Sequence, residues 1–468
     1  MMEPETIVPQ AVGTFNDIEA TVWAIARRFA VELTQQCLAE LDDKLDADRP
    51  AGFRHKGYRT RRLVTVFGDV EVRRRYYEDE RGRMRFLLDE ALKLQPRKRL
   101  TEQVRRVARK LCCELTYRRA TEVLDELLGV RIEAQTGHTL VQELGQEIEE
   151  AERKLVEAVF EGRVMPESGE LKSPFLCVEA DGVNIRLQRE GKRKSAEVKV
   201  GTAYDGWQER AGRTEVTHKL VYVFLGNGPD FWDRYALQIH GRWDLAAARR
   251  VIVGGDGAEW VEQGTRMFPG AEFQLDRYHL RRRVSEALGH EELARLVGDA
   301  LVAGQWQVVD EGLDLALRLN PARKNEIAEL RAWAESNRDK AKDWRLRGGY
   351  VPENARGTGA IEGNVDKSAA DRLKKRGRGW TIRGASNLVQ VMNHERLGGL
   401  DRVGESIMAQ RMLAGSEAIA KRKVVESLDL PGRGPRAGVP LLRYGRNGES
   451  FTALIRNIIS KGGLPTSA

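Results

Sequence analysis

Three things are scarce in this sequence: cysteine, long apolar runs and any segment with the features of a secretory signal. The 468 residues include only 4 cysteines, and none forms a Cys-X-X-Cys pair, which argues against a zinc site. We therefore expect buried, reduced thiols. No stretch approaches the roughly 20 apolar residues that a membrane-spanning helix requires, so we expect no membrane partner. The N-terminus contains acids and no continuous apolar run, which predicts a cytoplasmic location.

The composition describes a soluble, folded chain with an excess of positive charge. Hydrophobic residues make up 41% of the sequence and charged residues 32%, and a chain of this length should hold two to four domains. The net charge of +8 favours a polyanionic partner such as nucleic acid. Basic clusters at residues 73–75, 281–283 and 374–380 strengthen this interpretation, although a solvated helix face or strand edge explains the first two equally well.

The N-terminal third predicts helices and one β-hairpin. A long helix should begin at Asn16, with Glu19 completing a capping box, and its apolar residues recur every three or four positions. That stripe fits a core face or a face that packs on a second subunit. Residues 60–77 predict a β-hairpin that turns at Gly68-Asp69. Its arginines either face DNA or protect an exposed sheet edge.

Residues 101–150 show a helical pattern that is broken at Gly129. Short helices around a glycine turn are typical of a DNA-binding helix-turn-helix. An ordinary three-helix packing unit gives the same periodicity, so both interpretations stay open.

From residue 174 the pattern changes to strands, followed by alternating helices and strands. The predicted strands cover residues 175–180, 185–188, 198–204, 220–225, 251–253 and 273–275, and helices are predicted around 231–240 and 260–268. Another helix should begin near Tyr278-His279, and residues 284–350 are helical in pattern. This order is that of an α/β, RNase H-like fold interrupted by an all-α insertion. In that fold the first and fourth strands end beside each other.

Three acidic residues stand at the ends of these segments. Asp181 and Asp256 each follow a strand and precede a glycine, and Glu362 lies near the start of a helical pattern. Carboxylates are the ligands that Mg²⁺ prefers, and two ions can drive in-line attack on a phosphodiester. We predict two Mg²⁺ or Mn²⁺ ions, with Asp181 bridging them and Asp256 and Glu362 each serving one. Taken singly, each Asp-Gly pair is equally well explained as a turn.

Four neighbouring residues compete for roles in this site. By strand alternation, Glu179 points to the same face as Asp181, and Asp366 lies one helical turn from Glu362. Asp276 and His279 follow the strand predicted at 273–275, and there His279 either positions a substrate or forms a structural hydrogen bond.

A basic segment follows Glu362 and is a predicted contact for DNA. If the Glu362 helix runs to about residue 373, the cations beyond it lie near the strand that flanks the scissile bond. An aromatic ring there is suited to stacking on an unpaired base. The predicted DNA-binding residues are Lys374, Lys375, Arg376, Arg378 and Trp380.

Several short motifs, in this order, resemble the ISLre-type transposases of bacterial insertion sequences, a DDE family long filed as uncharacterised. The motifs occupy residues 65–70, 75–77, 87–90, 115–120, 179–183, 255–260, 275–280 and 361–367. The resemblance implies an RNase H-like domain with a helical insertion that uses Asp181, Asp256 and Glu362. The segment 372–380 departs from the family in being more basic and lacking methionine.

We therefore predict a metal-dependent transposase that cuts the ends of an element and joins them to target DNA. Its partners would be double-stranded DNA and further copies of the chain, as a homodimer or higher oligomer at the bacterial nucleoid. A DNA-binding protein that has lost catalysis and an RNase H-like nuclease are the alternatives. The predicted domains are 1–150 for DNA binding, 170–283 and 351–430 for the catalytic core, 284–350 for the insertion, and a tail, 431–468.

Overall fold

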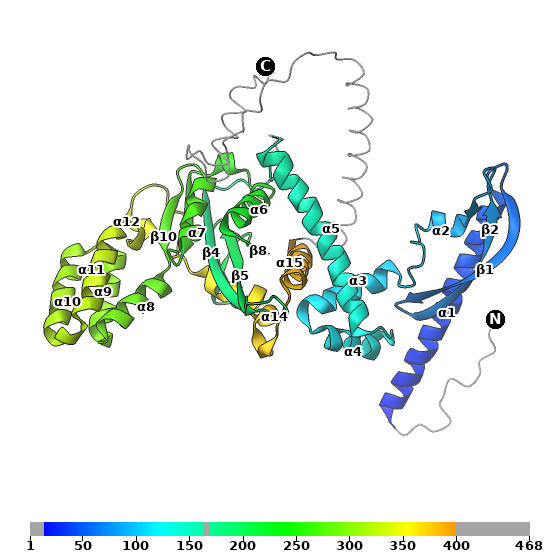
Figure 1. Ribbon diagram of the computed structural model, residues 1–468, viewed down its shortest axis with the longest axis horizontal. Helices are drawn as coiled ribbons and strands as arrows, with labels where there is room; N and C mark the ends of the chain where they lie inside the picture. Colours follow the sequence, from blue (N-terminus) through cyan, green and yellow to red (C-terminus); the bar gives the residue numbers. More distant parts are fainter. Residues whose placement is uncertain (1–13, 163–165, 167, 398–468) are drawn as a thin grey trace, which may run out of the picture. The chain divides into compact units, whose positions relative to one another are not determined.

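The computed structural model describes residues 14–162, 166 and 168–397 (Figure 1). The predicted tail and the last part of the predicted 351–430 segment lie outside these residues. The chain divides into two compact units, Met1–Glu143 and Leu144–Ala468. None of the described helices combines the length and the hydropathy needed to span a membrane.

The first unit consists of helices and a three-stranded sheet. Its elements are α1 (Phe15–Ala47), β1 (Arg54–Thr65), β2 (Gly68–Glu78), β3 (Met84–Arg85), α2 (Leu87–Ala91), α3 (Glu102–Glu114) and α4 (Tyr117–Leu128), and α5 (Ala134–Phe160) continues into the second unit. Strands β1 and β2 form the predicted hairpin, but Thr65 pairs with Gly68, so the turn is Val66-Phe67 rather than Gly68-Asp69. Gly68, with φ +128°, instead opens the second strand.

Helix α1 begins one residue before the predicted position and has a different cap. The Asp17 carboxylate accepts a hydrogen bond from the backbone N–H of Thr14 at 2.8 Å, so these residues, not Asn16 and Glu19, form the capping box. One face of α1 packs on the hairpin through Val31, Leu38, Leu41 and Leu45. The opposite apolar positions are exposed and do not belong to this core: Ile18, Val22, Phe29 and Leu33.

Helices α3, α4 and α5 follow the predicted pattern. Gly129 has a left-handed φ of 58° and ends α4, which confirms the predicted break. Helix α5 begins at Ala134 and runs to Phe160, well past the predicted segment. A small core joins these helices to β1 through Val64, Val104, Ala108, Leu124, Val130 and Leu140.

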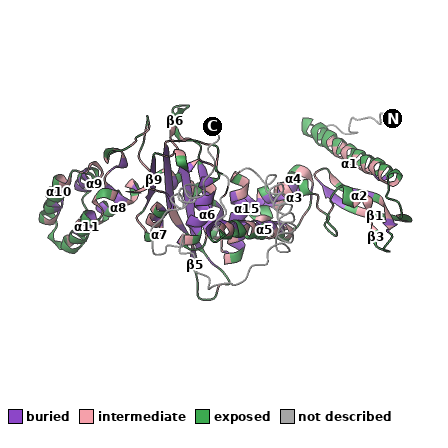
Figure 2. Ribbon diagram, turned by 90° about the horizontal axis from the view of Figure 1, so that it is seen from above, coloured by how far each residue is buried: buried purple, intermediate pink, exposed green. Residues whose placement is uncertain are grey.

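The second unit is built on a five-stranded mixed sheet, which confirms the α/β prediction. Its strands are β4 (Phe175–Arg186), β5 (Ser195–Tyr204), β8 (Leu220–Leu225), β9 (Arg250–Gly255) and β10 (Glu272–Leu275), in the spatial order β10-β9-β4-β5-β8. Strand β4 is antiparallel to β5 and parallel to β9, and β10 is parallel to β9. The central strands are almost entirely buried (Figure 2).

Strand β4 is longer than the sequence predicts. It runs without a break through Asp181 and Gly182, which pair with Val200 and Lys199 of β5. The two strands predicted at 175–180 and 185–188 are therefore one, and Asp181-Gly182 is not a turn. Continuous pairing with β5 keeps this glycine in the extended conformation of the strand.

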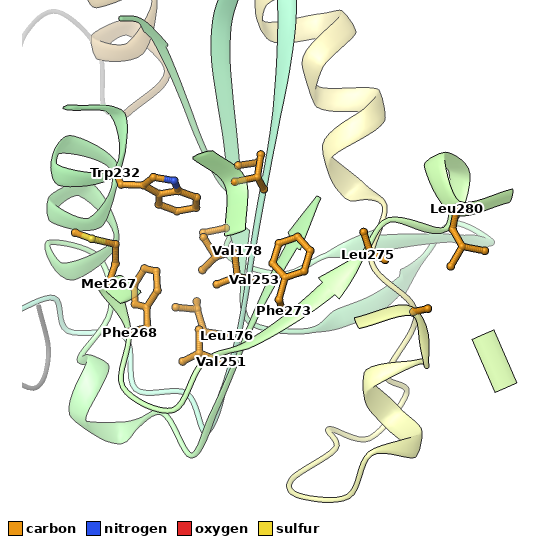
Figure 3. Packing of buried hydrophobic residues seen from close by; sticks show 14 of the residues in the cluster. Leu176, Val178, Trp232, Val251, Val253, Met267, Phe268, Phe273, Leu275 and Leu280 are labelled. Atoms are coloured by element: carbon orange, nitrogen blue, oxygen red, sulfur yellow. The ribbon is translucent and has the colours of Figure 1, made fainter. Parts of the chain in front are cut away.

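One face of the sheet is covered by helices that bury large aromatic side chains. Helix α6 (Gly228–His240) contributes Trp232, and a short helical segment, α7 (Glu259–Glu262) with Gln263–Met267, ends beside it. Figure 3 shows Trp232, Met267 and Phe268 against Val178 and Val253 of the sheet. Burial of these groups is the main stabilising contribution in this unit.

The predicted set of helices lies between β10 and Glu362. They are α8 (Arg277–Leu288), α9 (Glu291–Ala303), α10 (Trp306–Leu319), α11 (Lys324–Ser336) and α12 (Arg338–Ala341), and they pack mainly on one another. The sequence analysis does not predict β3, α2, the hairpin β6 (Trp207–Arg210) and β7 (Arg213–Val216), or α15 (Ile382–Leu397), and α14 (Asp371–Leu373) lies in the helical run predicted after Glu362.

The cysteines largely follow the prediction. Cys112, Cys113 and Cys177 are buried, Cys37 is exposed, and none of these four thiols forms a disulfide in the described part of the chain. The exposure of Cys37 contradicts the expectation that all four thiols are buried, because it lies on the outer face of α1.

Candidate functional site

The sheet brings Asp181 and Asp256 to the same edge. Glu179 of β4 pairs with Gly254 of the parallel strand β9, so Asp181 and Asp256 each follow two residues further along. Neighbouring strands lie about 4.8 Å apart. Strand β9 ends at Gly255, where β4 continues, and Asp256 then turns away with its Oδ1 accepting from the N–H of Ala258 at 2.8 Å. The left-handed φ of Gly257, +89°, permits this turn.

Glu362 comes from a segment that is much later in the sequence than β4 and β9. It lies on α13 (Ala360–Val365), which packs against β4 and β5. The helical path continues through a π-helical turn, Asp366–Ala370, to the end of α14, so the predicted run to about Leu373 is confirmed. π-helical turns are frequent at functional sites.

Glu179 anchors the start of α13. Its buried carboxylate accepts hydrogen bonds from the backbone N–H groups of Gly359, at 3.0 and 3.1 Å, and Ile361, at 2.9 Å. The Tyr204 hydroxyl donates a further bond at 2.5 Å. Burial raises the pKa of Glu179, and the bonds from Tyr204, Ile361 and Gly359 oppose that rise. Glu179 thus shares the face of Asp181, as predicted, but acts as a support for the helix that carries Glu362.

The other two acids act electrostatically on Asp181. The pKa of Asp181 is raised to about 6, chiefly by burial, with the charges of Asp256 and Glu362 contributing to the rise, whereas the N–H of Gly182 and the charge of His279 oppose it. Asp181 is half-buried, and Asp256 and Glu362 are exposed. Asp181 on β4, Asp256 directly after β9 and Glu362 on α13 therefore lie near enough for the charges of the last two to act on the first.

His279 and Asp276 lie beside the triad. Asp276 is buried and caps α8, where its Oδ1 accepts from the N–H groups of Tyr278 and His279 and lies 3.2 Å from His279 Nδ1. That hydrogen bond raises the pKa of His279, and the charges of Asp181 and Asp256 act in the same direction. His279 is thus a structurally hydrogen-bonded histidine, and the charges of Asp181 and Asp256 act on it.

The chemical type of these three side chains suits a divalent cation. Three carboxylates supply hard oxygen ligands, and among residues 14–162, 166 and 168–397 none of Asp181, Asp256 and Glu362 forms an ion pair with Lys or Arg. Within the same residues, no group of three or more acidic, histidine or cysteine side chains is already arranged to hold a metal.

The basic segment after Glu362 is largely engaged in structure. Lys375 pairs with Asp366 at 3.0 Å, and Arg378 donates to the carbonyl oxygen of Asp371 at 2.9 Å. Trp380 is buried, and its Nε1 donates to Leu373 at 2.8 Å, so its predicted stacking on a base is wrong for this structure. Lys374 is exposed, and the side chain of Arg376 lies outside the described part of the structure.

Glu179 lies on the face that strand alternation predicts, but its role as a support for α13 was not predicted. The donors come from Gly359 and Ile361, far along the chain, and no local pattern announces that contact. The buried run from Phe175 to Ala180 was the only available signal, because a carboxylate inside it must find hydrogen-bond partners.

One similar chain among the solved structures is a remote neighbour. A crystal structure of NurA bound to dAMP and manganese covers 56% of this chain and 62% of its own, with 14% identity and a TM-score of 0.11. A score this low carries no inference about fold or activity.

Sequence comparisons give a clear family assignment. A UPF0236 protein of Caldanaerobacter subterraneus subsp. tengcongensis is 24% identical over 88% of this chain and 85% of its own length. A UPF0236 protein encoded in the vanSb 3' region of Streptococcus gallolyticus is 25% identical over 82% of this chain and 83% of its own. The model of an uncharacterised protein family, UPF0236, matches residues 11–410. Because that match covers most of the chain, the protein belongs to the UPF0236 family.

Proposed function

We propose that this protein is a DDE-type DNA transposase, which cuts the ends of a mobile element and joins them to target DNA. The observation that carries the proposal is the proximity of three acids at one edge of the sheet. The charges of Asp256 and Glu362 both raise the pKa of Asp181 there. Three carboxylates without Lys or Arg partners among the described residues are costly to hold together, and a divalent cation would offset that repulsion.

The order of the elements supports an RNase H-like core. Three consecutive strands form an antiparallel meander, and β9 and β10 then add in parallel beside the first strand, β4. The acids occupy the first strand, the end of the fourth and a later helix. The helices α8–α12 stand between the second and third acid, as an inserted domain would. The short-motif resemblance to ISLre-type transposases adds to this reading of the core.

Each residue of the site has a separate role in the proposed reaction. Asp181 would hold two ions, Asp256 one and Glu362 the other. When bound, Mg²⁺ or Mn²⁺ activates the attacking oxygen and neutralises charge on the leaving oxygen. Glu179 keeps the Glu362 helix in place, and Asp276 fixes the ring of His279. His279 faces the same cluster and is placed to orient a phosphate oxygen or a water molecule.

The proposal includes partners and location. The substrate is double-stranded DNA, as element ends and as target, and the basic charge of the chain suits it. Joining two ends requires a homodimer or a higher oligomer on DNA. The proposed location is the bacterial cytoplasm, at the nucleoid.

A cleavage assay tests the triad. The substitutions Asp181→Asn, Asp256→Asn and Glu362→Gln each remove a negative ligand with little change of shape. We expect each to lower Mg²⁺-dependent cleavage roughly a hundredfold or more, while DNA binding is retained. The substrate is labelled duplex DNA that contains the chromosomal segments flanking the gene on both sides.

Asp366→Asn is the matched control, because Asp366 is an exposed carboxylate on the same helical path that is already paired with Lys375. It should cleave as the parent protein does. Near-normal cleavage by any triad variant would remove that residue from the site. DNA binding without cleavage by the parent protein would favour a DNA-binding protein without catalysis.

A further inference from the structure

A basic pocket in the first unit lies outside the proposed catalytic site. It has a volume of about 700 Å³ and opens between the β1–β2 hairpin and the loop that follows α2. Between Arg54 and Arg99 basic residues outnumber acidic ones about two to one, and this segment surrounds the pocket. The volume is in the range of ligand-binding clefts rather than packing defects.

The inner wall of the pocket carries uncompensated positive charge. Arg61 and Arg74 both bind the same oxygen of Asp89, with Arg61 at 2.7 Å, and all three side chains are largely buried. The other oxygen of Asp89 and the Nε of Arg74 are buried without a hydrogen-bond partner. Two guanidinium groups share one carboxylate, so one positive charge remains without a counter-charge.

The outer rim adds three cations on a fixed loop. Lys93, Arg97 and Arg99 are exposed, and the described residues offer none of them an ion-pair partner. The backbone of Lys93 and Arg97 adopts left-handed φ values of 52° and 62°, which are strained for side chains of this kind and recur at ligand clamps.

The loop is held in this form by hydrogen bonds to β1. Arg61 donates to the carbonyl oxygens of Gln95 and Lys98 at 2.7 and 2.8 Å. Val64 exchanges backbone hydrogen bonds with Arg99 and Thr101, at 2.9 and 3.0 Å. The backbone that carries these cations is thus arranged before any ligand arrives, which lowers the cost of binding one.

We propose that this pocket holds consecutive backbone phosphates of duplex DNA, at a distance along the chain from the residues that cut it. The choice of DNA as ligand rests on the proposed function. A run of phosphates matches cations on both the wall and the rim, and arginine forks bind phosphate in two-pronged fashion. The other acid in the lining, Glu90, is already paired with Arg85 at 2.5 Å and does not oppose a phosphate.

The test uses the full chain carrying Asp181→Asn, so that DNA is bound and not cut. Lys93→Ala, Arg97→Ala and Arg99→Ala are combined, and binding to a fluorescent duplex is measured between about 50 and 300 mM salt. Each lost phosphate contact should lower the slope of log K against log salt by about 0.9. We expect a slope smaller by roughly 2 to 3 and an affinity at least about tenfold weaker near 100 mM salt.

A control triple, Arg28→Ala, Lys44→Ala and Arg81→Ala, removes the same charge from exposed, unpaired positions of the first unit away from the pocket. If both triple variants lose the same affinity and slope, the effect is one of net charge and the proposal is wrong. An unchanged slope in the pocket triple would also overturn it. Binding of a polyglutamate peptide that the pocket triple alone abolishes, with DNA binding intact, would assign the pocket to an acidic protein instead. Because cleavage is not read, failure here is distinct from failure of the proposed catalytic site.

Discussion

Two carboxylates two residues apart on β4 have opposite surroundings. Glu179 is buried and receives hydrogen bonds from the Tyr204 hydroxyl and from the N–H groups of Gly359 and Ile361. Asp181 receives one hydrogen bond, from its neighbour Gly182, and meets two like charges. The surroundings of Glu179 are typical of a structural carboxylate. Those of Asp181 are typical of a carboxylate in a functional site, where a bound cation would compensate the negative charges.

The raised pKa of Asp181 predicts a pH-dependent cost to stability. The folded value, about 6, lies above the ordinary value of 3.8, so the folded protein holds this proton more tightly than the unfolded chain. Stability from this group is full below about pH 4 and is lost as the pH rises through 6. Asp181→Asn should therefore stabilise the metal-free protein by about 1–2 kcal/mol at pH 7, allowing for partial exposure, and by little at pH 4.

Thermal unfolding of the parent and the variant at both pH values measures this difference. Added Mg²⁺ should narrow it at pH 7, by stabilising only the parent. Equal melting temperatures at pH 7 without metal would show that Asp181 carries no electrostatic cost.

At the scale of elements, the sequence predicted most of the second unit because its strands are short apolar runs and its helices are periodic. The errors arose where tertiary contacts decide the local structure. Asp181-Gly182 has the composition of a turn, yet pairing with β5 keeps it in the strand. Trp380 has the surroundings of a surface cluster, yet Leu373 and the strand bridge at Leu187 draw it inside.

The sequence predicts which acids lie near this edge of the sheet, but not how they are held. Asp181 and Asp256 follow recognisable strands that the parallel pairing of β4 and β9 aligns. The support from Glu179 depends on a contact across the fold, which periodicity does not report.

The link between β4 and α13 predicts a specific effect of Glu179→Gln. The amide replaces an acceptor oxygen with an NH₂ group that faces existing donors, so we expect a loss of about 1–3 kcal/mol in unfolding free energy. The Mg²⁺ concentration for half-maximal cleavage should also rise, because Glu362 is no longer held. Tyr204→Phe removes one hydrogen bond, and its loss should be about 0.5–1.5 kcal/mol.

Thermal unfolding and a Mg²⁺ titration of cleavage, run on both variants, separate support from general stability. A Glu179→Gln protein that is destabilised but keeps the parental Mg²⁺ dependence would limit Glu179 to the core. An unaltered melting temperature would indicate that the native carboxyl is protonated.

At the scale of the second unit, a buried polar network joins three helices to the sheet. Arg234 of α6 binds Glu149 and Glu152 of α5, each at 2.7 Å. Gln390 of α15 donates to Glu152 at 2.9 Å, and so does Tyr222 of β8. These contacts connect segments that are far apart in sequence, so the covering helices depend on one another.

The network predicts a large effect of one substitution. Arg234→Ala leaves Glu149 and Glu152 without their cation in a largely buried place, and we expect a loss of about 3–5 kcal/mol. Arg153→Ala is the control, because Arg153 also pairs with two glutamates of α5 but is about half exposed, so we expect a much smaller loss than for Arg234→Ala. Urea unfolding followed by tryptophan fluorescence compares the two. Similar losses would mean that the buried network adds no more than a surface ion pair, and that apolar packing alone holds α5, α6 and α15 on the sheet.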